Sequence, residues 1–337
     1  MTSGLSVDLP GGKKGRVLSG ARPTGRLHLG NYFGALKNWV SLQDDYDCFY
    51  FVADVHALTT VEDTVGLKQN TREMVLDWLA AGLDPDRSTL FIQSRVPEVL
   101  ELHAYLSMVT PMGSLQRVPS FKEQFRARAD SMNYGLVGYP VLQTADIIIY
   151  LANKVPVGVD QVPHVELSRE IVRRFNGQFG EVFPEPDALL SETPSIKGTD
   201  GDQKMSKSLD NHIELAATPE ETAQRVMSMV TDPQRARRTD PGRPWICNVY
   251  ALHQIFSNED YTKTVYDQCT AAAIGCVDDK RALADAINEN LEAFRERRAE
   301  LATQPNLVED VLATGTERAR AVAIQTMEEV RDRIGFF

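Results

Sequence analysis

Residues 16–31 read Arg-Val-Leu-Ser-Gly-Ala-Arg-Pro-Thr-Gly-Arg-Leu-His-Leu-Gly-Asn, and an apolar-periodic segment follows at 32–42. The first four residues form a short strand pattern, the proline and glycines predict a turn, and the segment behind them has the period of a helix. Strand, turn and helix in this order open a fold in which helices connect parallel strands. The expected fold class is therefore α/β.

The same alternation continues as far as residue 210. Residues 48–53 read Cys-Phe-Tyr-Phe-Val-Ala, a continuously apolar run that is typical of a strand covered on both faces. Further strands are expected at 89–92 and 155–157, and helices at 65–81, 139–152 and 162–175. This order predicts a Rossmann-like, doubly wound parallel sheet.

The C-terminal half has a different pattern. Residues 185–211 are rich in Pro, Ser, Thr, Gly and Asp, which predicts a loop. Only helical patterns follow, at 219–230, 246–257, 259–274, 278–302 and 316–334. We expect a flexible N-terminal extension at 1–15, a first domain at 16–211, and an all-helical domain at 212–315. The last helix, within 316–337, is expected to pack back on the first domain.

Composition limits the class of protein. The 337 residues are 42% hydrophobic and 25% charged, which is ordinary for a globular chain with room for two domains. No apolar run is long enough to span a membrane, and 1–16 lack the apolar core of a signal peptide, so a cytoplasmic protein without membrane association is expected. The net charge of -11 argues against a protein coated in nucleic acid. The arginine-rich stretch 235–243 is either a solvated face or a local phosphate contact.

The turn at 20–31 has the chemistry of a phosphate site. A turn that opens onto a helix N-terminus offers free backbone N–H groups and the positive end of the helix dipole. His28 and Asn31 add compact side-chain donors, and Gly30 allows close approach. Taken alone, His28 could equally cap the helix.

Residues 204–208 read Lys-Met-Ser-Lys-Ser. Two ammonium groups and two hydroxyls within five loop residues suit a leaving pyrophosphate better than a packed core, although a solvated turn is the alternative. A loop that closes as charge develops stabilises the transition state selectively. The two segments together indicate adenylate chemistry on ATP.

Two further polar residues stand out. Asp146 lies on an otherwise apolar helix, where an unpaired buried carboxylate costs several kcal/mol, so it needs a partner. His56 follows a strand, at the edge of the sheet where open α/β folds bind ligands, and is either a ligand contact or a satisfied core histidine.

These segments together resemble the class I aminoacyl-tRNA synthetases, in which a His-x-Gly-His-type segment and a Lys-Met-Ser-Lys-Ser loop bracket ATP. More narrowly, the chain is similar to the bacterial tryptophanyl-tRNA synthetases over nearly its whole length, most specifically at 139–150 and 155–170. The tyrosyl enzymes usually carry Gly-Gly-x-Asp-Gln followed by Trp-Gly-Asn, and neither stretch follows Gly158.

The resemblance implies an enzyme that activates L-tryptophan with ATP and then transfers it to tRNA(Trp). It implies that Asp146 accepts the indole N–H, that Tyr139 and Gln161 hold the ammonium group, and that His56 belongs to the same tryptophan site. It assigns catalysis to His28, Asn31, Lys204 and Lys207. The ATP contacts it implies are Arg22, Pro23, Thr24, Gly30, Asn31, Gly158, Val159, Asp160, Ile196, Lys204, Met205, Ser206, Lys207 and Ser208.

Cofactor and partners follow from the same resemblance. Mg²⁺ is expected to bind through the ATP phosphates, without a dedicated protein metal site. A homodimer is expected, with Met108, Val109 and Met112 either at its interface or in the core. The helical region at about 212–305 is expected to contact the tRNA anticodon.

The chain departs from the family pattern at two places. Arg22 stands where many members have Gln, and this cation would either tighten nucleotide binding or alter the response to amino-acid analogues. Cys247, Cys269 and Cys276 have the spacing of an iron–sulfur site found in some members, but Asp279 stands at the fourth position, so no cluster is expected.

Two other functions stay open at this point. A divergent duplicate would form the adenylate, charge tRNA poorly and act mainly as a tryptophan-dependent partner or sensor. A small nucleotidylyltransferase shares the His-x-Gly-His-type turn, but gives no reason for the long helical region or for Asp146.

Overall fold

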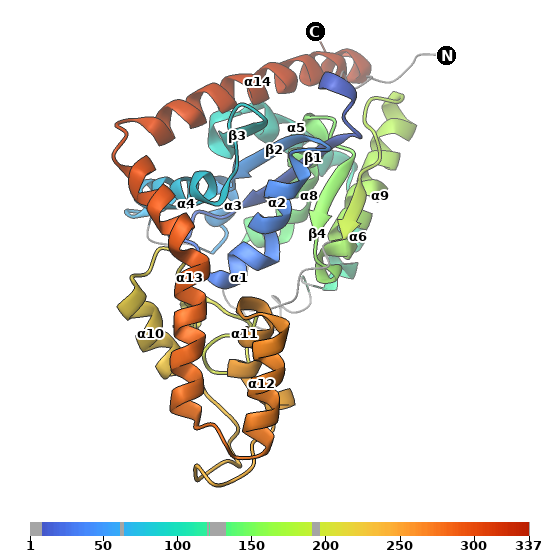
Figure 1. The fold of residues 1–337 in the computed structure, drawn as a ribbon. Helices are drawn as coiled ribbons and strands as arrows, with labels where there is room; N and C mark the ends of the chain where they lie inside the picture. The colour runs from blue at the N-terminus through green and yellow to red at the C-terminus, as the bar shows by residue number, and fades with distance from the viewer. Residues whose placement is uncertain (1–8, 61–63, 120, 122–132, 191–195, 337) are drawn as a thin grey trace.

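A computed structural model describes residues 9–60, 64–119, 121, 133–190 and 196–336. Its centre is a parallel sheet of β1 (Arg16–Ala21), β2 (Asp47–Val52), β3 (Ser88–Ile92), β4 (Lys154–Val157) and β5 (Asp187–Leu190). The described strands lie in the order β3-β2-β1-β4-β5 and every pairing is parallel (Figure 1). The order turns back between β1 and β4, which confirms the doubly wound sheet and creates a switch point there.

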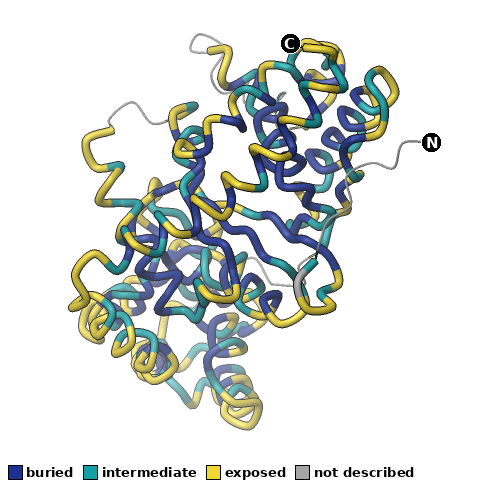
Figure 2. The backbone as a smooth tube through the Cα atoms, turned by 90° about the horizontal axis from the view of Figure 1, so that it is seen from above, coloured by how far each residue is buried: buried dark blue, intermediate teal, exposed yellow. Residues whose placement is uncertain are grey.

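Strand β2 is buried on both faces, as its continuous apolar sequence predicts. Cys48, Tyr50 and Val52 of β2 join one hydrophobic core, while Phe49 and Phe51 join the other. Figure 2 shows the resulting band of buried backbone through the middle of the molecule. Side chains of alternating direction therefore hold helices on both faces.

Two sets of helices supply these layers. One face of the sheet is covered by α2 (Lys37–Leu42) and α4 (Leu67–Ala81). The other face is covered by α5 (Glu98–Val109), α8 (Tyr134–Ile149) and α9 (Val162–Phe179). Shorter helices are α1 (Leu29–Asn31), α3 (Asp54–Ala57) and α6 (Met112–Arg117), and a π-helical turn, Tyr32–Leu36, joins α1 to α2. The predicted helix at 32–42 is thus the end of a longer helical run.

Several predicted boundaries were wrong. The loop predicted at 185–211 contains β5, which pairs with β4 at the edge of the sheet. The helix expected from 139 begins at Tyr134, because Asn133 caps it by accepting the N–H of Leu136 at 2.9 Å. The helix expected to end at 175 continues to Phe179, where Gly180 takes a positive φ of 96°.

The C-terminal half contains α10 (Pro219–Met227), α11 (Asn248–Phe256), α12 (Glu259–Thr270), α13 (Cys276–Ala302) and α14 (Leu307–Ile334). The first four lie below the sheet in Figure 1, and α14 returns across its top, next to β3. A Cβ atom on Gly315 would lie 1.8 Å from the carbonyl oxygen of Leu90, so only glycine allows this close approach. The helix begins at Leu307, well before the predicted 316.

An ion-pair network joins α13 to α4 and to the turn before α1. The Nε of Arg298 lies 2.5 Å from Oδ1 of Asp77, and Arg298 also bonds to Glu73. The other oxygen of Asp77 accepts the backbone N–H of Leu27 at 2.6 Å. Asp77 is fully buried, and burial raises the pKa of its carboxyl. The cation of Arg298 opposes this shift, and Asp77 links α13 to the turn that carries His28.

The predicted N-terminal extension is only partly described, since 1–8 lie outside the described residues. From 9 onward the chain contacts the loop after α2. Lys13 donates to the carbonyl oxygens of Gln43 at 2.7 Å and Asp44 at 3.0 Å, and Lys14 pairs with Asp45 at 3.0 Å. Within the described ranges, the helices are too short or too polar to cross a membrane.

Candidate active site

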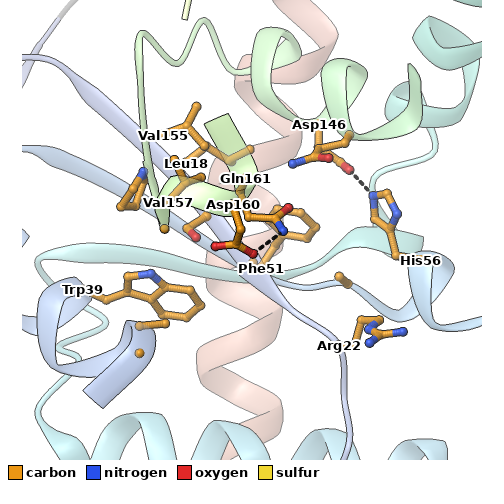
Figure 3. Close-up of a pocket in the computed structure, with 18 of the residues that line it drawn as sticks. Leu18, Arg22, Trp39, Phe51, His56, Asp146, Val155, Val157, Asp160 and Gln161 are labelled. Carbon is orange, nitrogen blue, oxygen red and sulfur yellow. Dashed lines mark hydrogen bonds and ion pairs between the residues drawn. The ribbon is translucent and has the colours of Figure 1, made fainter. Parts of the chain in front are cut away.

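A cavity of about 900 Å³ opens at the carboxyl ends of the central strands, at the switch point between β1 and β4. Open α/β sheets bind their ligands at this position. Its apolar lining includes Leu18, Val155 and Val157, which lie together in Figure 3, and Phe51, which lies apart from them. Its polar lining consists of Ser19, Arg22, Asn38, His56, Thr59, Thr60, Tyr139, Gln143, Asp146, Asp160, Gln161 and Lys204.

Asp146 lies at one end of this cavity, on α8, with only 2% of its surface exposed. Its Oδ2 lies 2.8 Å from Nε2 of His56, as the dashed line in Figure 3 shows. The amide nitrogen of Gln93 donates to both carboxylate oxygens, at 2.8 and 2.9 Å. Burial raises the pKa of Asp146, and the bonds from His56 and Gln93 oppose that shift. The structure thus supplies the partners that the sequence required.

Gln93 was missed by sequence reasoning, although a signal existed. It comes directly after β3, as His56 comes shortly after β2. The carboxyl ends of neighbouring parallel strands meet at one edge of the sheet, so both residues reach the same carboxylate.

Tyr139, on the same helix as Asp146, and Gln161, in the turn after β4, also line the cavity. The hydroxyl of Tyr139 bonds to Nε2 of His164 at 2.8 Å, and Gln161 donates to Asp160 at 2.9 Å. His164 is a second residue that the sequence did not single out, and burial lowers the pKa of its imidazole. Two polar groups therefore face the cavity, one from α8 and one from the turn between β4 and α9.

In the turn at 20–31, here called the signature turn, His28 and Asn31 bond to each other. Nδ1 of His28 accepts the N–H of Asn31 at 3.3 Å, and Oδ1 of Asn31 accepts the N–H of His28 at 3.1 Å. This reciprocal capping uses the groups expected to face phosphates, and the N–H of Tyr32 also bonds to the carbonyl of His28. The prediction of free N–H groups on this turn was therefore wrong for Asn31 and Tyr32. Gly30 alone of this set lines the cavity.

The loop at 204–208 is held by backbone bonds and brings its two lysines to different places. Met205 is buried, and its N–H bonds to the carbonyl of Ile196 at 3.0 Å. Lys204 lines the cavity, whereas Nζ of Lys207 donates to the carbonyl of Thr24 at 2.9 Å. Asn211, which sequence reasoning missed, anchors the loop by accepting the N–H of Ser206 at 2.7 Å.

The remaining predicted ATP residues lie around the same mouth. The cavity lining includes Arg22, Gly158, Val159, Asp160 and Ile196. Nη1 of Arg22 donates to Oγ1 of Thr60 at 3.1 Å, on the side of the cavity nearer His56. Pro23, Thr24, Met205, Ser206 and Ser208 do not line it. About half of the predicted ATP contacts line the cavity, and the others lie on the signature turn and on the loop at 204–208.

Comparison with known proteins gives the same family. Residues 11–292 match the family model of class I tRNA synthetases for tryptophan and tyrosine. The chain belongs to this family. The tryptophan–tRNA ligase of Thermotoga maritima is 50% identical over 325 residues, which cover 94% of this chain and 98% of the relative. That of Aquifex aeolicus is 42% identical over 389 residues, covering 94% and 98%.

Solved synthetase structures show the same fold. Tryptophanyl-tRNA synthetase from Campylobacter jejuni, complexed with ADP and tryptophan, superposes with a TM-score of 0.85 at 36% identity, and covers 95% of this chain and 100% of that one. A tyrosyl-tRNA synthetase from Archaeoglobus fulgidus reaches 0.65 at 20% identity, with 84% and 90% covered, and shows the fold alone.

The synthetase carries an arginine among its C-terminal cysteines. Nη1 of Arg235 lies 3.5 Å from Sγ of Cys269 and 3.7 Å from Sγ of Cys276. Cys247 is buried nearby, and each cysteine of this group is a free thiol. Asp279, at the fourth position of the spacing, has its Oδ1 3.2 Å from Nε2 of His253.

The buried imidazole of His28 makes the stability of this synthetase pH-dependent. Burial first, then His212, Lys207 and Lys204, lower the pKa of His28 from 6.5 to about 4. Between these values the unfolded chain binds a proton at His28 and the folded chain does not, so stability falls as the pH falls. His28→Asn keeps a good capping residue without this titration. We expect the stability advantage of the original protein to be largest at about pH 7 and to shrink toward about pH 4.5.

Urea unfolding of both proteins across this range measures the effect. A difference in unfolding free energy that stays constant with pH would contradict the lowered pKa of His28.

Proposed function

We propose that the chain is a tryptophan–tRNA ligase, which converts L-tryptophan and ATP to tryptophanyl-adenylate and pyrophosphate and then transfers tryptophan to tRNA(Trp). Curated ligases at 41–50% identity over nearly the whole chain support it. The observation that carries the choice of substrate is the buried Asp146 carboxylate at the end of an apolar slot. A carboxylate there fits an aromatic ring that carries one N–H.

In this proposal the indole ring lies against the apolar lining of the cavity, with its N–H on Asp146. Leu18, Phe51, Val155 and Val157 contact the ring. The ammonium group bonds to Tyr139 and Gln161, and His56 orients Asp146. A Cβ on Gly20 would lie 2.6 Å from the Phe51 ring, so the slot also needs glycine at that strand end.

ATP then occupies the other side of the mouth. Gly158, Val159 and Ile196 contact the adenosine, and Asp160 accepts from the ribose hydroxyls. Arg22, Pro23 and Thr24 approach from the signature turn, while Gly30, Met205, Ser206 and Ser208 add backbone and hydroxyl contacts. His28, Asn31, Lys204 and Lys207 stabilise the charge on the phosphates, with Mg²⁺ bound through those phosphates.

The reaction needs no general base, because the tryptophan carboxylate is ionised when it attacks the α-phosphorus. Pyrophosphate leaves in line, and a terminal ribose hydroxyl of tRNA later displaces AMP. Placement of the two substrates is worth up to about 7–11 kcal/mol in well-oriented systems. The protein's part is therefore orientation and charge stabilisation.

The proposed domain roles follow. Residues 16–211, with 316–337, form the catalytic domain, and 212–315 bind the anticodon, with 1–15 as an extension. Met108, at the end of α5, is 84% exposed and Met112, at the start of α6, is 54% exposed, which supports a homodimer contact there, with Val109 half-buried beside them. The enzyme acts in the cytoplasm, where its tRNA substrate is charged.

Amino-acid-dependent exchange between ATP and pyrophosphate tests the first half-reaction, with tryptophan and tyrosine side by side. Exchange with tryptophan alone is expected. Exchange with tyrosine only, or with neither, would contradict the assignment. Charging of tRNA(Trp) is then measured on the same preparation, because good exchange with poor charging would favour the divergent duplicate.

A further inference from the structure

Gln93 is a fully buried amide whose bonds all point at the candidate substrate site. It is 1% exposed, directly after β3. Its Nε2 donates to Oδ1 and Oδ2 of Asp146 at 2.8 and 2.9 Å. Its Oε1 accepts the backbone N–H of His56 at 3.3 Å. One side chain thus joins the carboxylate to the backbone of the residue that supplies the other bond to it.

The orientation of this amide is determined by its partners. If the amide were flipped, its oxygen would face a carboxylate and its nitrogen would face a backbone N–H, so both contacts would be repulsive. The carboxylate has about four acceptor positions, of which Gln93 and His56 together use about three. At least one remains for a donor inside the cavity.

We propose that Gln93 is a positioning residue that sets the selectivity of the site for the indole N–H, by fixing the direction in which Asp146 presents its remaining acceptor position. The inference rests on the proposed function. Gln93 does not line the cavity, so it acts on tryptophan only through Asp146. Without it, the carboxylate keeps the single bond from His56 and is free to rotate about its last torsion.

A purely structural role does not explain this residue. A methionine has nearly the same length and would fill the same buried space without a polar group that must be paired. The hydrogen bonds that the Gln93 amide makes go to Asp146 and His56, which both line the cavity. A defect in Gln93 is therefore expected to appear in the choice of substrate rather than in folding.

The test compares tryptophan with an analogue in which sulfur replaces the indole N–H, 3-benzothienyl-alanine. Both are assayed by ATP–pyrophosphate exchange in the original protein, in Gln93→Met, and in the control Ser94→Ala. Ser94 is the next residue, is exposed, and bonds to Asp54 rather than to Asp146. In Gln93→Met we expect KM for tryptophan to rise about tenfold, KM for ATP to stay constant, and the preference for tryptophan over the analogue to fall about tenfold. Ser94→Ala is expected to change none of these.

A second variant guards against poor folding of the first. Gln93→Leu also removes the donor, with an apolar side chain of slightly smaller volume, so the preference for tryptophan should fall about as far. Thermal unfolding of each variant is recorded alongside. Equal losses for tryptophan and the analogue, or an unchanged preference in both Gln93 variants, would overturn the inference. If the original protein does not activate tryptophan at all, the proposed function fails instead.

Discussion

Replacing Lys207 with alanine is expected to slow the formation of tryptophanyl-adenylate by about 10²- to 10³-fold, while tryptophan affinity stays nearly constant. Nζ of Lys207 donates to the carbonyl of Thr24 at 2.9 Å, and the closest carboxylate oxygen of Glu214 is 3.9 Å away. The ammonium group is thus held at the signature turn by one neutral acceptor. It is available to a pyrophosphate that gains charge as it leaves.

Lys207 is also separated from the tryptophan slot, which is why the two effects should differ. Burial lowers its pKa, and the cation in turn lowers the pKa of His28 beside it. The charge of Lys207 therefore acts on His28, and both residues lie where the phosphates of ATP are proposed to bind. Removing the cation therefore removes an interaction that the transition state uses and bound tryptophan does not.

Single-turnover measurement of adenylate formation, with tryptophan affinity taken from fluorescence titration, separates the two quantities. Lys197→Ala is the matched control, since Lys197 is an exposed lysine that pairs in backbone register with Lys204 but stands outside the proposed site. It should leave both quantities unchanged. Equal losses of rate and affinity in Lys207→Ala would contradict the assignment of this lysine to the leaving group.

Asp146→Asn is expected to lower kcat/KM for tryptophan by about 10³-fold and to remove most of the selectivity for an indole N–H. The carboxylate accepts from His56 at 2.8 Å and from Gln93 at 2.8 and 2.9 Å, and the proposed indole N–H adds another donor. An asparagine amide has a single acceptor oxygen and presents its own N–H groups to these donors. Several buried donors would therefore lose their acceptor together.

The control for Asp146→Asn lies within the same assay. KM for ATP should change little, because the proposed ATP contacts, among them Gly158, Val159 and Ile196, do not include Asp146. Tryptophan and the sulfur analogue should become nearly equivalent substrates. An unchanged KM for tryptophan, or an equal rise in KM for ATP, would show that Asp146 has only a structural part.

Strand β2 was predictable from sequence because a strand that is buried on both faces consists almost entirely of apolar residues. The run at 48–53 is apolar without alternation, which only a strand covered on both faces explains, and the structure places β2 there. β5 was not predictable in this way. It is a half-exposed edge strand, and Asp187 at its start pairs with Lys154 and Arg169, so tertiary contacts rather than local propensity select it.

The site was predictable in part for the same reason. An aspartate on an apolar helix indicates that it has a hydrogen-bond donor as a partner. Which residue donates depends on which strand ends lie next to each other in the sheet. Gln93 and His56 reach Asp146 from positions 53 and 90 residues away in the chain. Capping of the helix by His28 was open as an alternative, but the reciprocal bond to Asn31 was not foreseen. The contact of Lys207 with Thr24 spans 183 residues and has no local signal.

The network at Asp77 limits how the molecule can be divided or recombined. Asp77 belongs to α4, Arg298 to α13, and the N–H that Asp77 accepts belongs to Leu27 in the signature turn. A fragment that ends before α13 would leave a buried carboxylate without its cation next to that turn. A chimera that takes its helical half from a relative must bring an arginine to the position of Arg298. The boundary of a transplantable catalytic unit therefore runs behind α13, although the sheet itself ends far earlier in the chain.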